Sequence, residues 1–279
     1  MSDQMESSFE NKWMPMTSVA SGLEFDVLPG VYCYTNQIVN VVFLRSGNDW
    51  YLIDAGMPHS ADTIKSAFEA HAGVEVAPKA ILLTHGHFDH VGGIIELIEQ
   101  WQVPVYAHEL ELPYLTGQKD YPEPDGSVEG GLIAKMSPLF PNDAINLTDH
   151  VQAFGENGQI PGLSDWKWIH TPGHTPGHVS FYREEDRTLI AGDAFVTVRQ
   201  DSLYKVFTQK QEISGPPKYF TTDWQAAWNS VKTLEALKPS TAITGHGLPM
   251  SGEVLRKGLA ELSRDFKKLA MPDHGKYLQ

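Results

Sequence analysis

The most informative segment of the sequence is Thr84-His85-Gly86-His87-Phe88-Asp89-His90, which directly follows the apolar run Ile81-Leu82-Leu83. Four of its side chains, three imidazoles and one carboxylate, are of the types that bind divalent metal ions such as zinc. A catalytic zinc ion typically has three protein ligands and an open position, so four ligands this close in sequence do not easily serve one ion. The motif therefore predicts a metal site that takes further ligands from elsewhere in the chain.

Three more candidate ligands stand directly after short apolar runs. They are His174 after residues 168–170, Asp193 after residues 189–192 and His246 after residues 243–245. Loops at strand ends bring side chains from distant parts of a chain onto one rim of a rigid scaffold. Four such loops would supply seven ligands. Their tight turns are suited to glycine, which stands at Gly86, Gly173, Gly192, Gly245 and Gly247.

The rest of the chain alternates between strand-like and helix-like stretches. Strands are predicted at residues 25–28, 31–35, 41–44, 50–54, 80–83, 103–107, 166–169, 179–182, 188–191 and 241–244. Helices are predicted from Ser60, as a cap, to Gly73, from Gly92 onward, over 224–237 and over 255–266. This pattern favours a layered α+β sandwich formed by one domain over residues 23–279, with residues 1–22 as an N-terminal extension.

Two long segments are candidates for covers over the site. Residues 113–141 are rich in Pro, Gly and acidic side chains and are predicted to form a surface excursion. Residues 195–223 carry many aromatic and aliphatic side chains and form either an apolar wall over the metals or an ordinary packed loop. Together they would make a partly covered pocket suited to a small carbonyl compound.

Composition narrows the classes of partner. The 279 residues include 21 Lys plus Arg and 35 Asp plus Glu, a formal charge of −14, which disfavours nucleic acid and anionic membranes as partners. The single cysteine, Cys33, rules out an intrachain disulfide. Residues 1–13 contain no apolar stretch of the secretory type, and no run is long enough to span a bilayer. We expect a cytoplasmic protein with a small-molecule substrate; the sequence does not indicate its oligomeric state.

The order of the motifs resembles that of the metallo-β-lactamase-fold superfamily of metallohydrolases. The motifs are residues 84–90, Thr171-Pro172-Gly173-His174, Gly192-Asp193 and Gly245-His246-Gly247, and the likeness extends from Phe25 to the last helix. It implies an αββα sandwich built from two similar halves. It also implies that one metal is held by His85, His87 and His174, that the second is held by Asp89, His90 and His246, and that Asp193 bridges them.

The resemblance also suggests two supporting residues. In the doublet Thr171 to His178 the superfamily's ligand is the first histidine, so His178 is expected to support the site rather than bind metal. Asp54, at the end of the run Tyr51-Leu52-Ile53, matches an aspartate that supports the metal loop from behind. A simple turn aspartate at the end of a strand is the alternative for Asp54.

The predicted function is that of a dinuclear metal-dependent hydrolase that uses a metal-bridging hydroxide on a small acyl substrate. Asp89 is the predicted catalytic residue, because it binds the second metal and can orient the hydroxide. The cofactors are two divalent ions, with Zn²⁺ preferred and Mn²⁺ or Fe²⁺ as alternatives. Neither a G-x-S-x-G motif nor a cysteine dyad is present, which disfavours covalent acyl-enzyme chemistry.

Within the superfamily the sequence most resembles the glyoxalase II and lactonase-like branch. The Thr-Pro-Gly-His doublet resembles that of glyoxalase II, a thioesterase, although the chain beyond His246 is too short for that family's helical domain. Lactonases of the fold have a tyrosine where this chain has Val196, and true β-lactamases of the fold lack the bridging aspartate. An ester, lactone or thioester is the expected substrate. A phosphodiesterase, an iron-dependent redox enzyme of the same fold and an inactive metal-stabilised binding protein are the alternatives.

Overall fold

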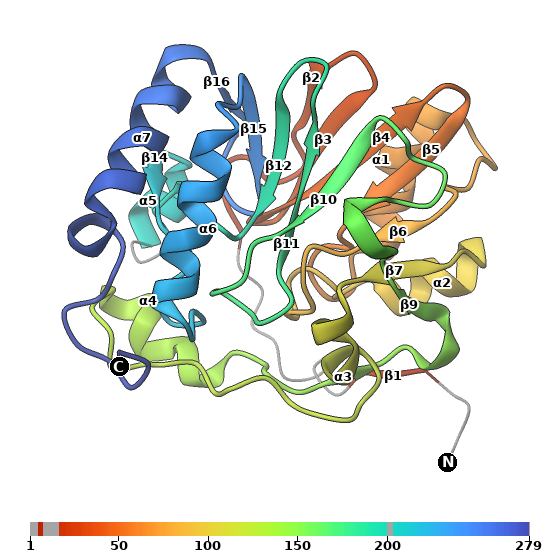
Figure 1. The fold of residues 1–279 in the computed structure, drawn as a ribbon. Helices are drawn as coiled ribbons and strands as arrows, with labels where there is room; N and C mark the ends of the chain where they lie inside the picture. Colours follow the sequence, from red (N-terminus) through yellow and green to blue (C-terminus); the bar gives the residue numbers. More distant parts are fainter. Residues whose placement is uncertain (1–4, 8–16, 200–202, 279) are drawn as a thin grey trace.

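A computed structural model describes residues 5–7, 17–199 and 203–278 of the chain. These residues form four layers, in which two β-sheets pack face to face and helices cover the outer face of each sheet. In Figure 1 the helices α6 and α7 lie on the left and α1 and α2 on the right, with the strands between them. The αββα sandwich that the sequence predicts is confirmed.

The first sheet has seven strands and comes from the N-terminal half of the chain. Its first four strands are antiparallel and the remaining strands run parallel to β5. The strands, in spatial order, are β2 (Glu24–Leu28), β3 (Val31–Asn36), β4 (Val39–Ser46), β5 (Asp49–Ile53), β6 (Ile81–Leu82), β7 (Val105–Ala107) and β9 (Val151–Ala153).

The second sheet has five strands and comes from the C-terminal half. Only its central pair, β12 with β15, is parallel. The strands, in spatial order, are β10 (Trp166–His170), β11 (Val179–Arg183), β12 (Thr188–Gly192), β15 (Thr241–Thr244) and β16 (Met250–Ser251). Two small two-stranded sheets pair β1 (Glu6–Ser7) with β8 (Ile145–Asn146) and β13 (Val196–Val198) with β14 (Gln211–Ser214).

Four longer helices form the outer layers. They are α1 (Ala61–Ala72), α2 (Ile94–Trp101), α6 (Trp224–Ala236) and α7 (Gly252–Leu269). Shorter helices lie in the connections: α3 (Leu112–Leu115), α4 (Gly131–Met136) and α5 (Leu203–Thr208), with 3₁₀ turns at Glu109–Glu111, Ser137–Leu139, Thr148–His150 and Glu156–Gly158.

Alternating side chains along the strands produce the layers. On β4, Val41 and Phe43 pack in the core beneath α1, where the ring of Phe43 meets that of Phe68 edge-on at 5.5 Å. Val42 and Leu44, on the other face of β4, pack in the core between the two sheets. This two-residue period buries both faces of the strand, which makes β4 a central strand of the sandwich.

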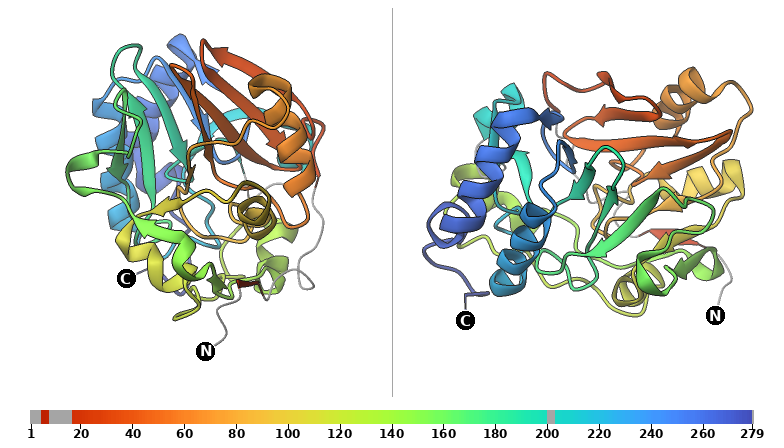
Figure 2. Two further views of the ribbon diagram at one scale, coloured as in Figure 1. Left: turned by 90° about the vertical axis from the view of Figure 1, so that its right-hand side faces the viewer. Right: turned by 45° about the horizontal axis from the view of Figure 1, so that its top comes forward.

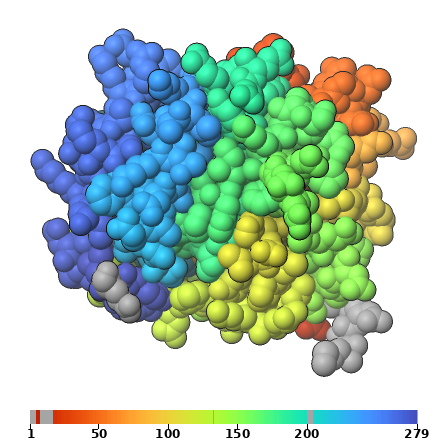
Figure 3. Space-filling model, viewed as in Figure 1, coloured from red at the N-terminus to blue at the C-terminus, as the bar shows by residue number. Residues whose placement is uncertain are grey.

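The predicted elements are found, with two differences in detail. Ser60 precedes α1, but its side chain makes no capping hydrogen bond, and its carbonyl oxygen accepts from Ile64 N at 2.9 Å instead. Residues 113–141 lie along the lower edge of the molecule in Figures 1 and 3 and are not simply a surface excursion. Tyr121, Ile133 and Phe140 in this segment are buried. Removing their large apolar surfaces from water favours this arrangement.

The second predicted cover segment, residues 195–223, divides into two kinds of surface. Tyr219 and Phe220 are buried in the core that also contains Phe43 and lies beneath α1, whereas Tyr204 and Phe207 on α5 are exposed. Residues 200–202 of this segment, and residues 1–4 and 8–16 of the predicted N-terminal extension, lie outside the described residues. Among the described residues, no helix combines the length and the apolar character needed to cross a bilayer.

Candidate metal centre

The loops that carry the predicted ligands meet where strands of the two sheets end. The first loop follows β6, and the others follow β10, β12 and β15, so each half of the sandwich contributes. The two views of Figure 2 show the strands of the two halves lying side by side between the outer helices. The seven predicted ligands, which span 162 positions of sequence from His85 to His246, form three overlapping buried groups. Two of these groups are described below, and the third, His85, His90 and Asp193, connects them. The structure thus brings all of them together.

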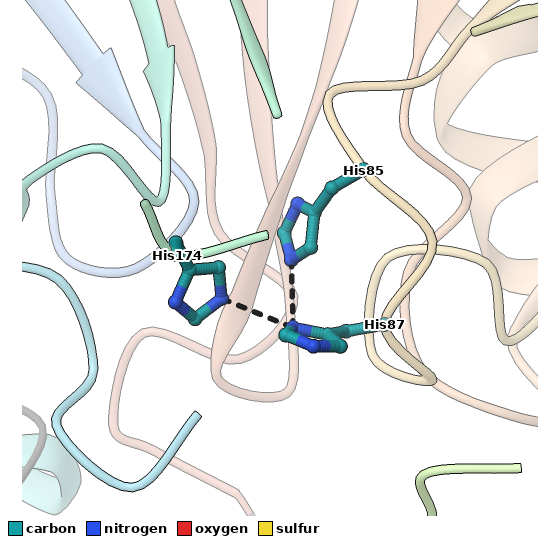
Figure 4. Close-up of side chains that lie close together, drawn as sticks. All are labelled: His85, His87 and His174. Carbon is teal, nitrogen blue, oxygen red and sulfur yellow. Dashed lines mark hydrogen bonds between the residues drawn. The ribbon is translucent and has the colours of Figure 1, made fainter. Parts of the chain in front are cut away.

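The first group consists of three histidines. His87 Nδ1 lies 3.0 Å from His85 Nε2 and 3.0 Å from His174 Nε2. Figure 4 shows the three rings pointing toward one another, with His85 and His87 on one loop and His174 on the opposite side. Ligands at about 2.0–2.1 Å from a tetrahedral ion are about 3.3 Å apart, so the spacing of these nitrogens is close to that of a zinc site.

The second group consists of Asp89, His90 and His246, and Asp193 lies between the two groups. Asp89 Oδ2 is 3.3 Å from His246 Nε2. Asp193 Oδ2 is 3.3 Å from His246 Nε2, 3.5 Å from His174 Nε2 and 3.7 Å from His90 Nε2. One carboxylate oxygen therefore contacts nitrogens of both groups, which is the position expected of a bridging ligand.

Burial keeps the first group neutral. Desolvation lowers the pKa of His87 to about 4, and it holds the pKa values of His85 and His174 well below the ordinary range, with further lowering from neighbouring imidazoles. Neutral imidazoles keep a nitrogen lone pair free at neutral pH. Three lone pairs directed at one point are suited to bind a cation.

The two histidines of the second group lie among carboxylates, those of Asp54, Asp89 and Asp193. Burial opposes ionisation of Asp193, yet the adjacent His246 and His90 hold its pKa well below the usual value. Burial also opposes protonation of His246, but Asp193 and Asp89 raise its pKa to about 10. The pKa of His90 is raised in the same way by Asp54, Asp193 and Asp89. The buried carboxylates thus favour a positive charge at this place, and a bound divalent ion would supply that positive charge.

Hydrogen bonds behind the ligands fix which nitrogen faces inward. Asp54 Oδ2 accepts from His90 Nδ1 at 2.8 Å and from Thr84 Oγ1 at 2.8 Å, and Asp54 Oδ1 accepts from Thr84 N at 2.8 Å. His246 Nδ1 donates to the Ile38 carbonyl oxygen at 3.0 Å. A proton held at Nδ1 leaves Nε2 to face the centre, so these partners orient the imidazoles before any ion binds. The supporting position predicted for Asp54 agrees with this geometry.

His178 lies behind Asp193. Its Nε2 accepts from Asp193 N at 2.9 Å, so its proton is on Nδ1, which faces Thr171 Oγ1 at 2.9 Å. Burial lowers its pKa to about 3, which keeps the ring neutral. This position is consistent with the supporting role predicted for His178. Glycine at 245 is needed nearby, because a Cβ there would lie 2.0 Å from Asp193 Oδ1.

Two buried polar atoms in this cluster have no hydrogen-bond partner among the described residues. They are His90 Nε2 and Asp193 Oδ1. An unpartnered buried polar atom costs about 1–3 kcal/mol, so such atoms call for a ligand. The two orphaned atoms and the donor set of imidazole nitrogens and carboxylate oxygens fit divalent ions such as Zn²⁺, Mn²⁺ or Fe²⁺.

The comparisons with known proteins agree with this architecture. Residues 34–246 match the family model described as the metallo-beta-lactamase superfamily. The chain belongs to this superfamily. Among its relatives, the probable metallo-hydrolase YflN of Bacillus subtilis is 49% identical over 90% of this chain and 96% of its own length. The probable metallo-hydrolase YybB of the same organism is 31% identical over 75% of this chain and 80% of its own length.

Solved structures show the same fold. The protein TTHA1623, whose structure is solved in a di-iron-bound form, is 28% identical in sequence to this chain. The match covers 81% of this chain and 92% of the TTHA1623 chain, with a TM-score of 0.54. MEM-A1, a subclass B3 metallo-beta-lactamase from a soil metagenome library, is 23% identical, covers 82% of this chain and 81% of that chain, and gives a TM-score of 0.57. This metallo-β-lactamase superfamily member is thus a metal-dependent hydrolase by class, with a His and Asp cluster compatible with a metal site.

Sequence reasoning missed Thr221 and Glu111 beside the superfamily site, whereas Phe220 lies in the segment 195–223 that it offered as an apolar wall over the metals. His174 Nδ1 lies 3.2 Å from Thr221 Oγ1, and the ring of Phe220 lies 4.5 Å from that of His87. The buried carboxylate of Glu111 lies next to the His85 loop. The aromatic content of residues 195–223 was the available signal for Phe220. Nothing local distinguishes Thr221 or Glu111, because their partners are distant in sequence.

Proposed function

We propose that this chain is a dinuclear metal-dependent hydrolase that cleaves a small, uncharged ester, lactone or thioester. His85, His87 and His174 would hold one ion, Asp89, His90 and His246 the other, and Asp193 both. Two bound divalent ions would supply a Lewis acid and a water that is acidic enough to act as a nucleophile near neutral pH.

The observation that carries this proposal is the position of Asp193 Oδ2. It lies within 3.3–3.7 Å of His174 in the first group and of His90 and His246 in the second. A single-ion site would not need a carboxylate shared by two groups. Seven buried ligands also exceed what one tetrahedral ion uses.

Asp89 is the residue we assign to the chemistry. Its carboxylate faces the pocket beside His87 and Phe88, and His90 and His246 keep its pKa below the ordinary value despite burial. An ionised carboxylate in this place can accept a hydrogen bond from the attacking water and fix its direction. His178 and Asp54, which hold Asp193 and His90 from behind, keep the surrounding ligands in place.

The lining of the pocket supports an uncharged acyl substrate. Beside Asp89, Asp193 and the histidines, the pocket is lined by an apolar and aromatic set: Ile38, Phe88, Phe140, Pro217, Tyr219 and Phe220. No Lys or Arg is among the described residues of this lining. Apolar walls bind the carbon skeleton of a ligand, and beyond the residues assigned to the metals this lining offers no charged side chain to hold an anionic substituent. This disfavours phosphodiesters and favours small carbonyl compounds.

Relatives add support on the substrate and on the metal. Hydroxyacylglutathione hydrolase GloC of Haemophilus influenzae, a thioester hydrolase by name, is 32% identical over 41% of this chain and 49% of its own length. TTHA1623 binds two irons in its solved structure. We therefore keep thioesters among the substrates, and we place Fe²⁺ beside Zn²⁺ and Mn²⁺ among the candidate metals.

A side-by-side substrate screen tests this proposal. The protein is loaded in turn with Zn²⁺, Mn²⁺ and Fe²⁺ and assayed with uncharged lactones, aryl esters, thioesters, β-lactams and bis(p-nitrophenyl) phosphate, with oxygen consumption followed in parallel. We expect kcat/KM for an uncharged acyl substrate to exceed that for the phosphodiester by at least about tenfold, because the apolar walls fit a carbon skeleton and supply no cationic side chain for a phosphate, and a difference of about 1.4 kcal/mol already gives that factor.

Two results of this screen would count against the proposal. Phosphodiester turnover above that of every acyl substrate would reassign the substrate class. Oxygen consumption in place of hydrolysis with the iron-loaded protein would reassign the chemistry to redox. Protein treated with a chelator is the control, and its activity should return when metal is added.

A further inference from the structure

Glu111 is a buried carboxylate that no predicted ligand set includes. It ends the 3₁₀ turn Glu109–Glu111 and has no exposed surface. Its Oε1 accepts from Thr175 Oγ1 at 2.7 Å and from Gly177 N at 2.8 Å. Its Oε2 accepts from Gly86 N at 3.1 Å and from the Tyr121 hydroxyl. A carboxylate out of water is costly unless donors satisfy it, and here four donors do so.

Three of these donors belong to the two loops that carry the first group of histidines, and the fourth, the Tyr121 hydroxyl, comes from the segment 113–141. Gly86 lies between His85 and His87, and Thr175 directly follows His174. One loop approaches Glu111, and the other approaches its partner Tyr121, too closely for a residue larger than glycine. A Cβ at Gly177 would lie 2.7 Å from Glu111 Cγ, and a Cβ at Gly86 would lie 2.6 Å from the Tyr121 hydroxyl. One side chain therefore ties together two loops that come from opposite halves of the sandwich.

We infer that Glu111 is a positioning residue, which sets the separation of the His85–His87 loop and the His174 loop so that three imidazole nitrogens converge. This inference rests on the proposed metal-binding function of those histidines. Tyr121 contributes in three ways, because its hydroxyl donates to Glu111 and accepts from Gly86 N at 3.0 Å, and its ring packs against His87 with centroids 4.6 Å apart. Partners behind metal ligands typically change metal affinity 10- to 100-fold.

The substitution Glu111→Gln tests this role at constant shape. The new amide has one oxygen and one NH₂ group in place of two acceptor oxygens. In either orientation the NH₂ group faces a backbone N–H, that of Gly86 or that of Gly177, so two donors oppose each other; in the first orientation Gly86 N keeps only its second acceptor, the Tyr121 hydroxyl at 3.0 Å. One loop must then move away from the other. A matched control is Glu109→Gln, which makes the same chemical change on an exposed residue of the same turn.

The readout is metal binding rather than activity. Co²⁺ affinity is measured by competition with a chromophoric chelator, and the visible absorption of bound Co²⁺ reports the geometry of the site. We expect Glu111→Gln to lower the affinity for the ion held by the first group about 10- to 100-fold and to change its spectrum. Glu109→Gln should match the wild type in both. The thermal unfolding of the metal-free variants shows whether they fold.

Milder variants decide the question if Glu111→Gln does not fold. Thr175→Val and Tyr121→Phe each remove one donor and leave the carboxylate, and each should lower Co²⁺ affinity by several-fold. Wild-type Co²⁺ affinity and spectrum in folded Glu111→Gln, or in both milder variants, would overturn the inference and leave the proposed function intact. A wild-type protein that binds no Co²⁺ at the three histidines would instead overturn the proposed function.

Discussion

Asp193→Asn is expected to lower kcat/KM by about three powers of ten and to lower the number of metal ions that the purified protein retains. The bridging position explains the size of the effect, because Asp193 Oδ2 contacts nitrogens of both histidine groups. An amide keeps the shape but loses the negative charge that would hold two cations close together. Metal ions contribute several kcal/mol to such reactions, and about 4 kcal/mol corresponds to about a thousandfold.

This prediction is tested by kinetics together with elemental analysis on the same sample. Asp149→Asn is a suitable control, since Asp149 is exposed and lies outside the pocket. The control should keep both metal content and rate. Full metal content with a wild-type rate in Asp193→Asn would show that this carboxylate does not bridge.

Asp89→Asn should fail in a different way. The variant keeps an oxygen that faces the pocket, so it should retain more metal than Asp193→Asn does. Its rate should still fall about 100-fold, because an amide cannot accept a proton from water or orient it as a carboxylate does, and groups of this kind contribute about 10²- to 10⁴-fold. The loss should appear in kcat more than in KM, since Asp89 acts on the chemical step.

Steady-state kinetics at matched metal content provide the measurement for Asp89. The comparison needs both aspartate variants loaded with the same ion, so that a loss of metal is not read as a loss of chemistry. Wild-type turnover in metal-loaded Asp89→Asn would remove Asp89 from the catalytic role and leave it as a ligand alone.

The fold and the meeting of the candidate ligands at one place could be predicted because their signals are local. The motif from Thr84 to His90 lies within seven residues, and His174, Asp193 and His246 each follow a short apolar run that forms a strand of the second sheet. The two-residue period along β4 is equally local. Such patterns involve residues that are neighbours in the sequence, so they can be recognised without knowledge of the folded structure.

The surroundings of the site could not be predicted because they depend on contacts between distant residues. Glu111 is 25 positions from Gly86 and 66 from Gly177, and no pattern in its own segment indicates these partners. The Pro- and Gly-rich composition of residues 113–141 suggested exposure, whereas Tyr121 and Phe140 are buried beside the site. Composition averages over a segment and does not show which of its side chains turn inward.

The measurement that tests the central claim most directly is the metal stoichiometry of the full-length protein. The folded, chelator-treated protein is supplied with excess Zn²⁺, freed of unbound ion and analysed for metal per chain, and the same is done with Fe²⁺ without oxygen. The structure predicts close to two ions per chain, because Asp193 joins two buried ligand groups. A reproducible value of one ion per chain, in folded protein with every ligand intact, would contradict the dinuclear centre.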